Sequence, residues 1–177
     1  MNRRSALQNL VLFAGGVMIF PACSRETKEG QPASIELTHL DVSADQEAMM
    51  AELVETLIPT TDTAGGKAMG LHLFVLNMVD DCYESTHQEA FLQGMAQFDE
   101  MARNQTGESF AATTPEQRQK LVADLNGRKG DDVLTTFYSI TKNETIKGYL
   151  NSELVMTKLR VYELVPGRYN PLFPIKA

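Results

Sequence analysis

One long apolar segment limits what this chain can fold into. Between Lys67 and Tyr83 nearly every residue is apolar, including Leu71, Leu73, Phe74, Val75, Leu76, Met78 and Val79. A helix over this segment would be apolar on all sides rather than along one face. Such a helix lies at the centre of a core or is covered by a partner. Other elements of the chain, or another protein, must therefore surround it.

Helix start and stop signals frame this segment on both sides. Ser43 is followed three residues later by glutamine, which forms a capping box, and apolar residues then recur at helical spacing until Pro59. A second capping box begins at Thr114, with a proline at the first helical position, and Gly127 suits the exit of that helix. The apolar stripes of these two helices are Met50, Leu53, Val54, Leu57 and Ile58 in the first and Leu121, Val122 and Leu125 in the second.

Two more helices are expected over residues 86–103 and 131–150. Their inward residues are Phe91, Met95, Phe98 and Met101 in the first, and Val133, Leu134, Phe137 and Ile140 in the second. No convincing strand pair and no internal repeat appears in the sequence. The predicted fold is therefore all-α, an irregular bundle of about five helices.

The C-terminal segment 162–174 differs from the rest of the chain. It contains three prolines, which exclude a helix, and more apolar residues than a free tail would carry. We expect it to lie extended across a surface, either of this protein or of another one.

The first residues have the form of an export signal. Arg3 and Arg4 provide a positive start, and Leu10 to Phe20 is an apolar run too short to span a membrane. The arginine pair, followed by one variable residue and an apolar pair, resembles the twin-arginine signal, whose route exports proteins already folded. Residues 1–22 are therefore interpreted as a signal peptide that directs the chain to the periplasm or cell envelope.

Cys23 closes the export signal. The residues before it resemble a lipobox, in which the thiol receives a lipid, and acyl chains contribute about 0.8 kcal/mol of membrane affinity per buried methylene. The alternative is a plain signal peptide with an ordinary thiol at this position. Residues 23–42 are read as the lipidated cysteine and a flexible tether, because the segment is mostly polar, and residues 43–177 as the helical domain.

The composition narrows the classes of partner and cofactor. The net charge of −7 argues against nucleic acid, whose phosphates favour lysine and arginine. If Cys23 is lipidated, only Cys82 remains, and no intramolecular disulfide can form. The sequence has no haem-attachment motif and no cysteine quartet for an iron–sulfur cluster. We therefore expect no cofactor in this chain.

Several polar residues in and after the apolar segment raise the question of a metal site. His72, Asp80, Asp81, Cys82 and His87 are metal-ligand types, yet their spacing does not set three or four ligands together. The alternative interpretation, a solvated acidic helix end, is preferred. The adjacent aspartates also oppose formation of a thiolate at Cys82, which a cysteine nucleophile needs.

Glu55 and Asp62 are candidates for a pair of catalytic carboxylates. Acids beside threonines at a helix junction are more often caps than acid–base pairs. The sequence therefore predicts no catalytic residue and no metal ligand.

Three stretches resemble one protein family. Residues 53–70, LVETLIPTTDTAGGKAMG, resemble the "ETxIPxTDTPGAxxAG" stretch of the gluconate 2-dehydrogenase subunit 3 family. Residues 145–149, TIKGY, and 165–169, VPGRY, resemble that family's closing motifs. The chain departs from the pattern at Ala64, where proline is common, and lacks a cysteine after the last motif. The resemblance therefore implies no disulfide at that point.

The resemblance implies a small subunit of a membrane-associated sugar or sugar-acid dehydrogenase. In that family a large subunit of the glucose-methanol-choline type holds FAD, and electrons pass to a cytochrome c subunit or another acceptor. The small subunit carries the export signal and stabilises the large one without catalysing the reaction. Residues of the matching motifs are then the suspected partner interface: Pro59, Asp62, Tyr149, Val165, Pro166, Gly167, Arg168 and Tyr169.

Two other functions remain open from the residues alone. The chain would be a solitary envelope lipoprotein, with a structural or ligand-binding role, if all its apolar surfaces were covered internally. It would be an enzyme in its own right if it held a site that the sequence does not reveal.

Overall fold

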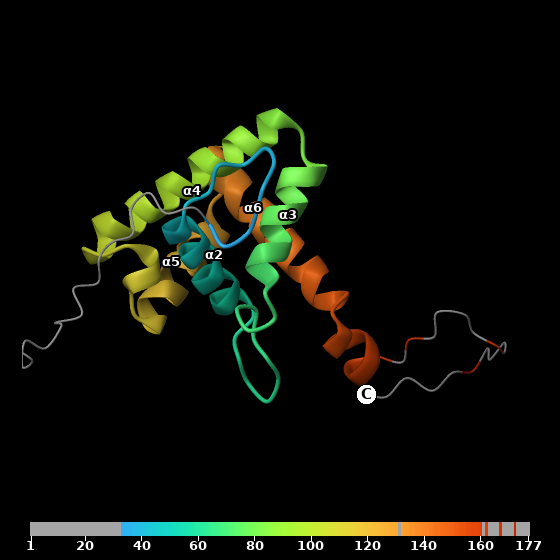
Figure 1. Ribbon diagram of the computed structural model, residues 1–177. Helices are drawn as coiled ribbons and strands as arrows, with labels where there is room; N and C mark the ends of the chain where they lie inside the picture. The colour runs from blue at the N-terminus through green and yellow to red at the C-terminus, as the bar shows by residue number, and fades with distance from the viewer. Residues whose placement is uncertain (1–32, 131, 161, 163–166, 168–171, 173–177) are drawn as a thin grey trace, which may run out of the picture.

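The computed structural model describes residues 33–130 and 132–160, together with Tyr162, Gly167 and Leu172. The signal peptide, Cys23 and most of the C-terminal segment lie outside the described residues. Within the described part, helices follow one another without a strand, as Figure 1 shows. They are α2 (Ala44–Leu57), α3 (Leu71–Cys82), α4 (Ser85–Thr106), the 3-10 turn η2 (Phe110–Ala112), α5 (Pro115–Gly127), α6 (Val133–Leu150) and the π turn η3 (Val155–Leu159). The all-α prediction is confirmed.

The helix boundaries follow the local signals in the sequence. Both predicted capping boxes form: the backbone N–H of Gln46 donates to Ser43 Oγ, and that of Gln117 donates to Thr114 Oγ1. The prediction was less accurate at the start of α3, which begins at Leu71 instead of Lys67. Residues 67–70 form a turn, and Gly70 adopts a left-handed conformation with φ of 66° that other residues avoid.

The core is built where α4 lies along α6. The rings of Phe91 and Phe137 lie 5.1 Å apart between centroids, and Phe98 contacts both Phe137 and Phe110, all four being fully buried. The two helices approach closely at Gly94, where an added Cβ would lie 2.3 Å from the carbonyl oxygen of Val133. A side chain at this position would therefore force the helices apart.

Helix α3 packs against both α2 and α6, as Figure 1 shows. Its buried residues are Leu71, Val75, Leu76, Val79 and Asp80, and Leu73, Phe74 and Met78 are half-buried. The protein's own elements therefore cover most of the segment that the sequence marked as apolar on every side.

The segment 33–42 is part of the folded body, which corrects the expectation of a tether up to residue 42. Leu40 and Val42 are buried in the core, and Ile35 and Leu37 pack against it. The carboxylate of Asp80, at the end of α3, accepts hydrogen bonds from the backbone N–H groups of Thr38, His39 and Leu40, each at 2.7 Å. The alternating apolar residues of this short segment bury enough surface to order it.

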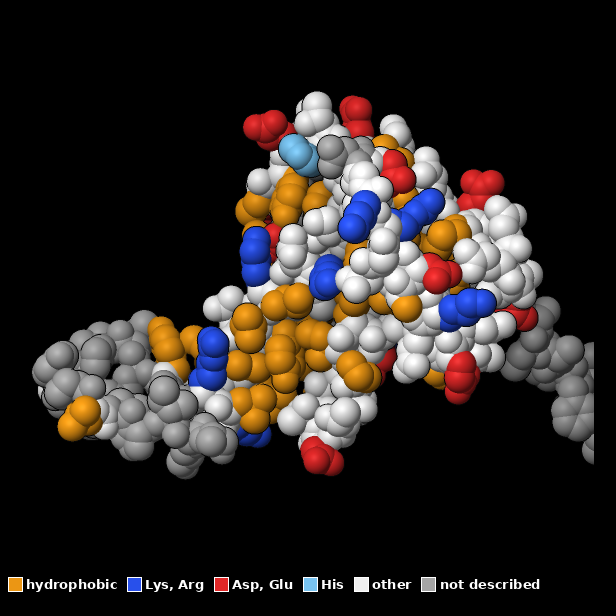
Figure 2. Space-filling model, turned by 180° about the vertical axis from the view of Figure 1, so that it is seen from behind, with side chains coloured by type: hydrophobic (Ala, Val, Ile, Leu, Met, Phe, Trp, Pro, Cys, Tyr) orange, Lys and Arg blue, Asp and Glu red, His pale blue; other side chains and the backbone are white. Residues whose placement is uncertain are grey.

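The surface shows one concentration of apolar side chains. Among the described residues, the large hydrophobic side chains that are exposed all lie at position 146 or later: Ile146, Leu150, Leu159, Tyr162 and Leu172. Figure 2 shows apolar side chains gathered on the lower part of the face seen from behind. No helix in the described part is both long and apolar enough to cross a membrane.

Candidate functional site

The loop between α2 and α3, residues 58–70, is organised around the carboxylate of Glu55. One of its oxygens accepts from the backbone N–H of Thr60 at 2.9 Å and from the Thr60 hydroxyl at 2.6 Å. The other accepts from the backbone N–H of Lys67 at 3.0 Å. Burial raises the pKa of Glu55, but these hydrogen bonds lower it by more, so that it falls below its ordinary value. The group is a stable carboxylate that closes the loop.

Two glycines allow the loop to close on α2. An added Cβ at Gly65 would lie 2.5 Å from both Glu55 carboxylate oxygens, and one at Gly66 would lie 2.5 Å from the carbonyl oxygen of Val54. The backbone N–H of Gly66 donates to the carbonyl of Ile58 at 2.8 Å, which joins the two ends of the loop. A side chain at Gly66 would therefore clash with the backbone of α2, whereas one at Gly65 would displace the Glu55 carboxylate from its place in the loop.

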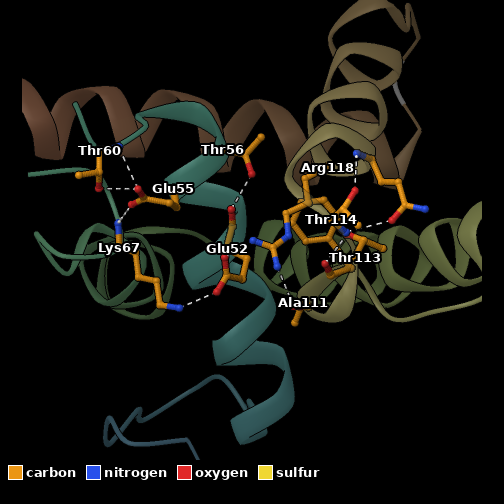
Figure 3. A network of polar contacts seen from close by, with 11 residues as sticks. Glu52, Glu55, Thr56, Thr60, Lys67, Ala111, Thr113, Thr114 and Arg118 are labelled. Carbon is orange, nitrogen blue, oxygen red and sulfur yellow. Dashed lines mark hydrogen bonds and ion pairs between the residues drawn. The ribbon is translucent and has the colours of Figure 1, made fainter.

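A second carboxylate, Glu52, ties the loop to the helical body one turn before Glu55. Its two oxygens bind the Lys67 ammonium, at 2.5 Å, and the guanidinium of Arg118 on α5. Arg118 also donates to the carbonyl of Ala111 at 2.8 Å and lies over the ring of Phe110. Figure 3 shows this continuous network, from Thr60 through Glu55, Lys67 and Glu52 to Arg118. The loop is therefore held at both sides by charged contacts.

The tip of the loop presents the suspected interface residues to solvent. Pro59 and Asp62 are exposed, and Figure 1 shows the loop projecting beyond the ends of α2 and α3. Asp62 therefore does not pair with Glu55, whose oxygens are engaged by Thr60 and Lys67. The Glu55 carboxylate thus binds backbone N–H groups of the loop that follows α2.

The remaining suspected interface residues lie near the end of the chain. Tyr149 is half-buried on the last turn of α6, and its carbonyl accepts from the Ser152 hydroxyl at 2.7 Å. Gly167 is exposed. Val165, Pro166, Arg168 and Tyr169 lie outside the described residues. The structure therefore does not place the closing motif relative to the loop.

The candidate metal ligands contact different partners in the structure. Asp80 holds the segment 33–42, and His72 lies 4.0 Å from a carboxylate oxygen of Glu47. Burial lowers the pKa of His72 most, and the Glu47 charge opposes this. His87 contacts the ring of Tyr83 edge-on, with centroids 6.3 Å apart. In the part of the chain that the structure describes, no three such side chains come together as metal ligands would.

A buried acid on α6 was missed by the sequence analysis. Glu144 is 1% exposed, and its Oε1 accepts from the Tyr83 hydroxyl at 2.7 Å and from the Lys147 ammonium at 2.6 Å. Burial and the hydrogen bond to Glu144 raise the pKa of Tyr83 to about 12. Glu144 on the inward side of an amphipathic helix, three residues before a lysine, was the signal in the sequence. The contact joins the end of α3 to α6.

The comparison with protein families gives one match. The model described as "Gluconate 2-dehydrogenase subunit 3" matches residues 44–167, which include the loop, its supporting network, the closing motif 145–149 and the first three residues of the motif 165–169. No curated protein and no solved structure matches this chain.

Proposed function

Because this chain belongs to the gluconate 2-dehydrogenase subunit 3 family, we propose that it is the non-catalytic small subunit of a membrane-associated flavoprotein dehydrogenase. Its large partner, of the glucose-methanol-choline type, holds FAD and oxidises a sugar or a sugar acid. Electrons leave that subunit for a cytochrome c subunit or another acceptor. The small subunit stabilises the large one and escorts it out of the cytoplasm.

The observation that supports this proposal is that the family motif, residues 53–70, forms a loop organised around a carboxylate. Its acid, Glu55, has both oxygens engaged by Thr60 and Lys67 and a lowered pKa. A general base needs a lone pair within reach of substrate and a pKa near the working pH. With these contacts and a lowered pKa, Glu55 is better suited to shaping the projecting loop than to accepting a proton from a substrate. A rigid projecting loop suits recognition of a partner.

The two ends of the chain supply the rest of the function. Arg3 and Arg4 direct export of the folded complex, since a subunit loaded with FAD in the cytoplasm must cross the membrane folded. Cys23 carries the lipid that holds the mature complex at the envelope membrane. The exposed tip of the loop, with Pro59 and Asp62, contacts the large subunit together with the C-terminal motif 165–169.

Purification of the complex from its native membrane tests the function. We expect a large protein to co-purify, with the absorption spectrum of a bound flavin and with sugar dehydrogenase activity. A colourless, monomeric small protein would contradict the proposal and support a solitary envelope lipoprotein. Activity of the isolated small chain would show that it is an enzyme itself.

Export and anchoring are tested by separate variants. Arg3→Lys with Arg4→Lys should leave both this chain and the flavoprotein in the cytoplasm, whereas Arg25→Lys, outside the signal, should not. Normal export of the double variant would exclude the twin-arginine route. Cys23→Ala should release mature protein from the membrane fraction, and continued membrane binding would exclude the lipid anchor.

A further inference from the structure

The C-terminal apolar surface, consisting of Ile146, Leu150 and Leu159, is a second candidate interface. These side chains are 42%, 38% and 55% exposed, and no other described element shows comparable apolar exposure. Ile146 and Leu150 lie four residues apart and therefore on one face of α6. The buried side chain of Val155 holds η3 to the body, so Leu159 has a fixed attachment. Exposed apolar patches on ordered elements are typical of association sites.

Basic side chains accompany the C-terminal apolar surface. Lys158 and Arg160, which precede and follow Leu159 in the chain, are exposed, and the side chain of Lys147, which follows Ile146, is 60% exposed. Over residues 133–160 the basic side chains Lys142, Lys147, Lys158 and Arg160 outnumber the acidic ones, Glu144 and Glu153. The chain as a whole carries a net charge of −7. The surface is therefore the basic flank of an acidic protein.

The charges around the C-terminal apolar surface indicate which kind of partner it binds. Binding to anionic lipid through charge takes a cluster of about 4–8 basic residues, whereas here the Lys147 ammonium already binds the Glu144 carboxylate and Glu153 is exposed nearby. A second copy of this chain, related by two-fold symmetry, would bring the same basic flank against itself. A different protein with acidic residues around an apolar patch would satisfy both the aliphatic and the basic side chains.

We propose that the C-terminal apolar surface is a docking site for the large flavoprotein subunit, whose complementary patch is apolar at its centre and acidic at its rim. This inference rests on the proposed function and adds a contact region on α6 and η3 to the loop. The aliphatic side chains supply the buried centre, and Lys158 and Arg160 steer the encounter and fix its orientation.

Two double variants of the full-length chain test the surface in the intact complex. Ile146→Ser with Leu150→Ser removes the apolar centre, and Lys158→Glu with Arg160→Glu reverses the rim charge. Each should lower the amount of flavin that co-purifies per small subunit by roughly tenfold or more. In the control, Arg128→Glu with Lys129→Glu reverses an exposed basic pair before α6 and should leave the ratio unchanged. Unchanged circular dichroism spectra would show that the variants are folded.

The outcomes separate this inference from the proposed function. If the wild-type chain brings down flavin and both variants do so equally well, the surface does not dock the large subunit, although the proposed function stands. If the wild-type chain brings down no flavin, the proposed function fails and this inference fails with it. Loss of binding to phosphatidylglycerol vesicles, or loss of self-association, with flavin retained would assign the surface to lipid or to a second copy. Weaker association of the wild-type complex at high salt would support the acidic rim.

Discussion

Removal of the Asp80 carboxylate should detach the segment 33–42 from the helical body. The side chain is 4% exposed and accepts three backbone hydrogen bonds of 2.7 Å, from Thr38, His39 and Leu40. Asp80→Ala leaves these donors without their acceptor. The neighbouring Asp81→Ala is a matched control, because Asp81 is exposed and lies on the same turn of α3.

The magnitude follows from the burial of the donors. A hydrogen bond to a charged group contributes about 1.5–3 kcal/mol, and a buried donor left unpaired costs about 1–3 kcal/mol. The Leu40 bond is buried, whereas those of Thr38 and His39 are only part-buried and water can replace the carboxylate there. We therefore expect Asp80→Ala to lower the free energy of unfolding by about 3 kcal/mol, and Asp81→Ala by less than about 0.5 kcal/mol.

Urea unfolding, followed by circular dichroism, measures the global effect, and amide hydrogen exchange measures the local one. If the segment opens without unfolding the body, exchange at Thr38 to Leu40 accelerates while the global transition moves little. The reasoning is refuted if Asp80→Ala matches Asp81→Ala in both measurements. Acid gives a second check, because the hydrogen bonds outweigh burial and hold the pKa of Asp80 below its ordinary value of 3.8. The stabilisation is therefore present at neutral pH and is lost as the pH falls below about 3.8, where wild type and Asp80→Ala should converge.

Three further predictions concern the core, α6 and the loop. Gly94→Ala should lower the free energy of unfolding by about 1–3 kcal/mol, because its Cβ would meet the Val133 carbonyl oxygen. Gly127→Ala, with open space around it, is the control. Equal melting temperatures of the two variants would contradict the close approach of α4 and α6 at Gly94. Tyr83 has a pKa raised from 10.0 to about 12, so its stabilising effect is complete below pH 10 and is lost as the pH rises toward 12. If the free energy of unfolding of Tyr83→Phe fell with rising pH in the same way as that of wild type, another group would be responsible for the loss. Glu55→Ala should accelerate amide exchange at Thr60 and Lys67 by roughly tenfold, whereas Asp62→Ala, exposed at the loop tip, should not.

Local signals in the sequence were sufficient for the helices. Ser43 and Thr114 each carry a side-chain acceptor, with a glutamine three residues later, and both boxes form as predicted. These contacts join residues three apart, so their geometry depends on the neighbouring residues and not on the rest of the fold. The candidate site was only partly predictable. The loop 58–70 was recognised from its resemblance to a family motif, but the network that supports it was not.

The packing of the segment 33–42 and the network around Glu52 depend on contacts between residues distant in the sequence. Asp80 reaches Thr38 to Leu40, about forty positions earlier, and Glu52 reaches Arg118 on a different helix. The sequence therefore determined that the described body is helical, where the two capping boxes start a helix, and which helix faces are apolar. Only the tertiary structure decided that 33–42 joins the core, that Glu55 is a structural acid, and that Ile146 and Leu150 stay exposed. The physical reason is that caps and periodicity are set within one or two turns, whereas the partner of a buried carboxylate depends on how the helices pack.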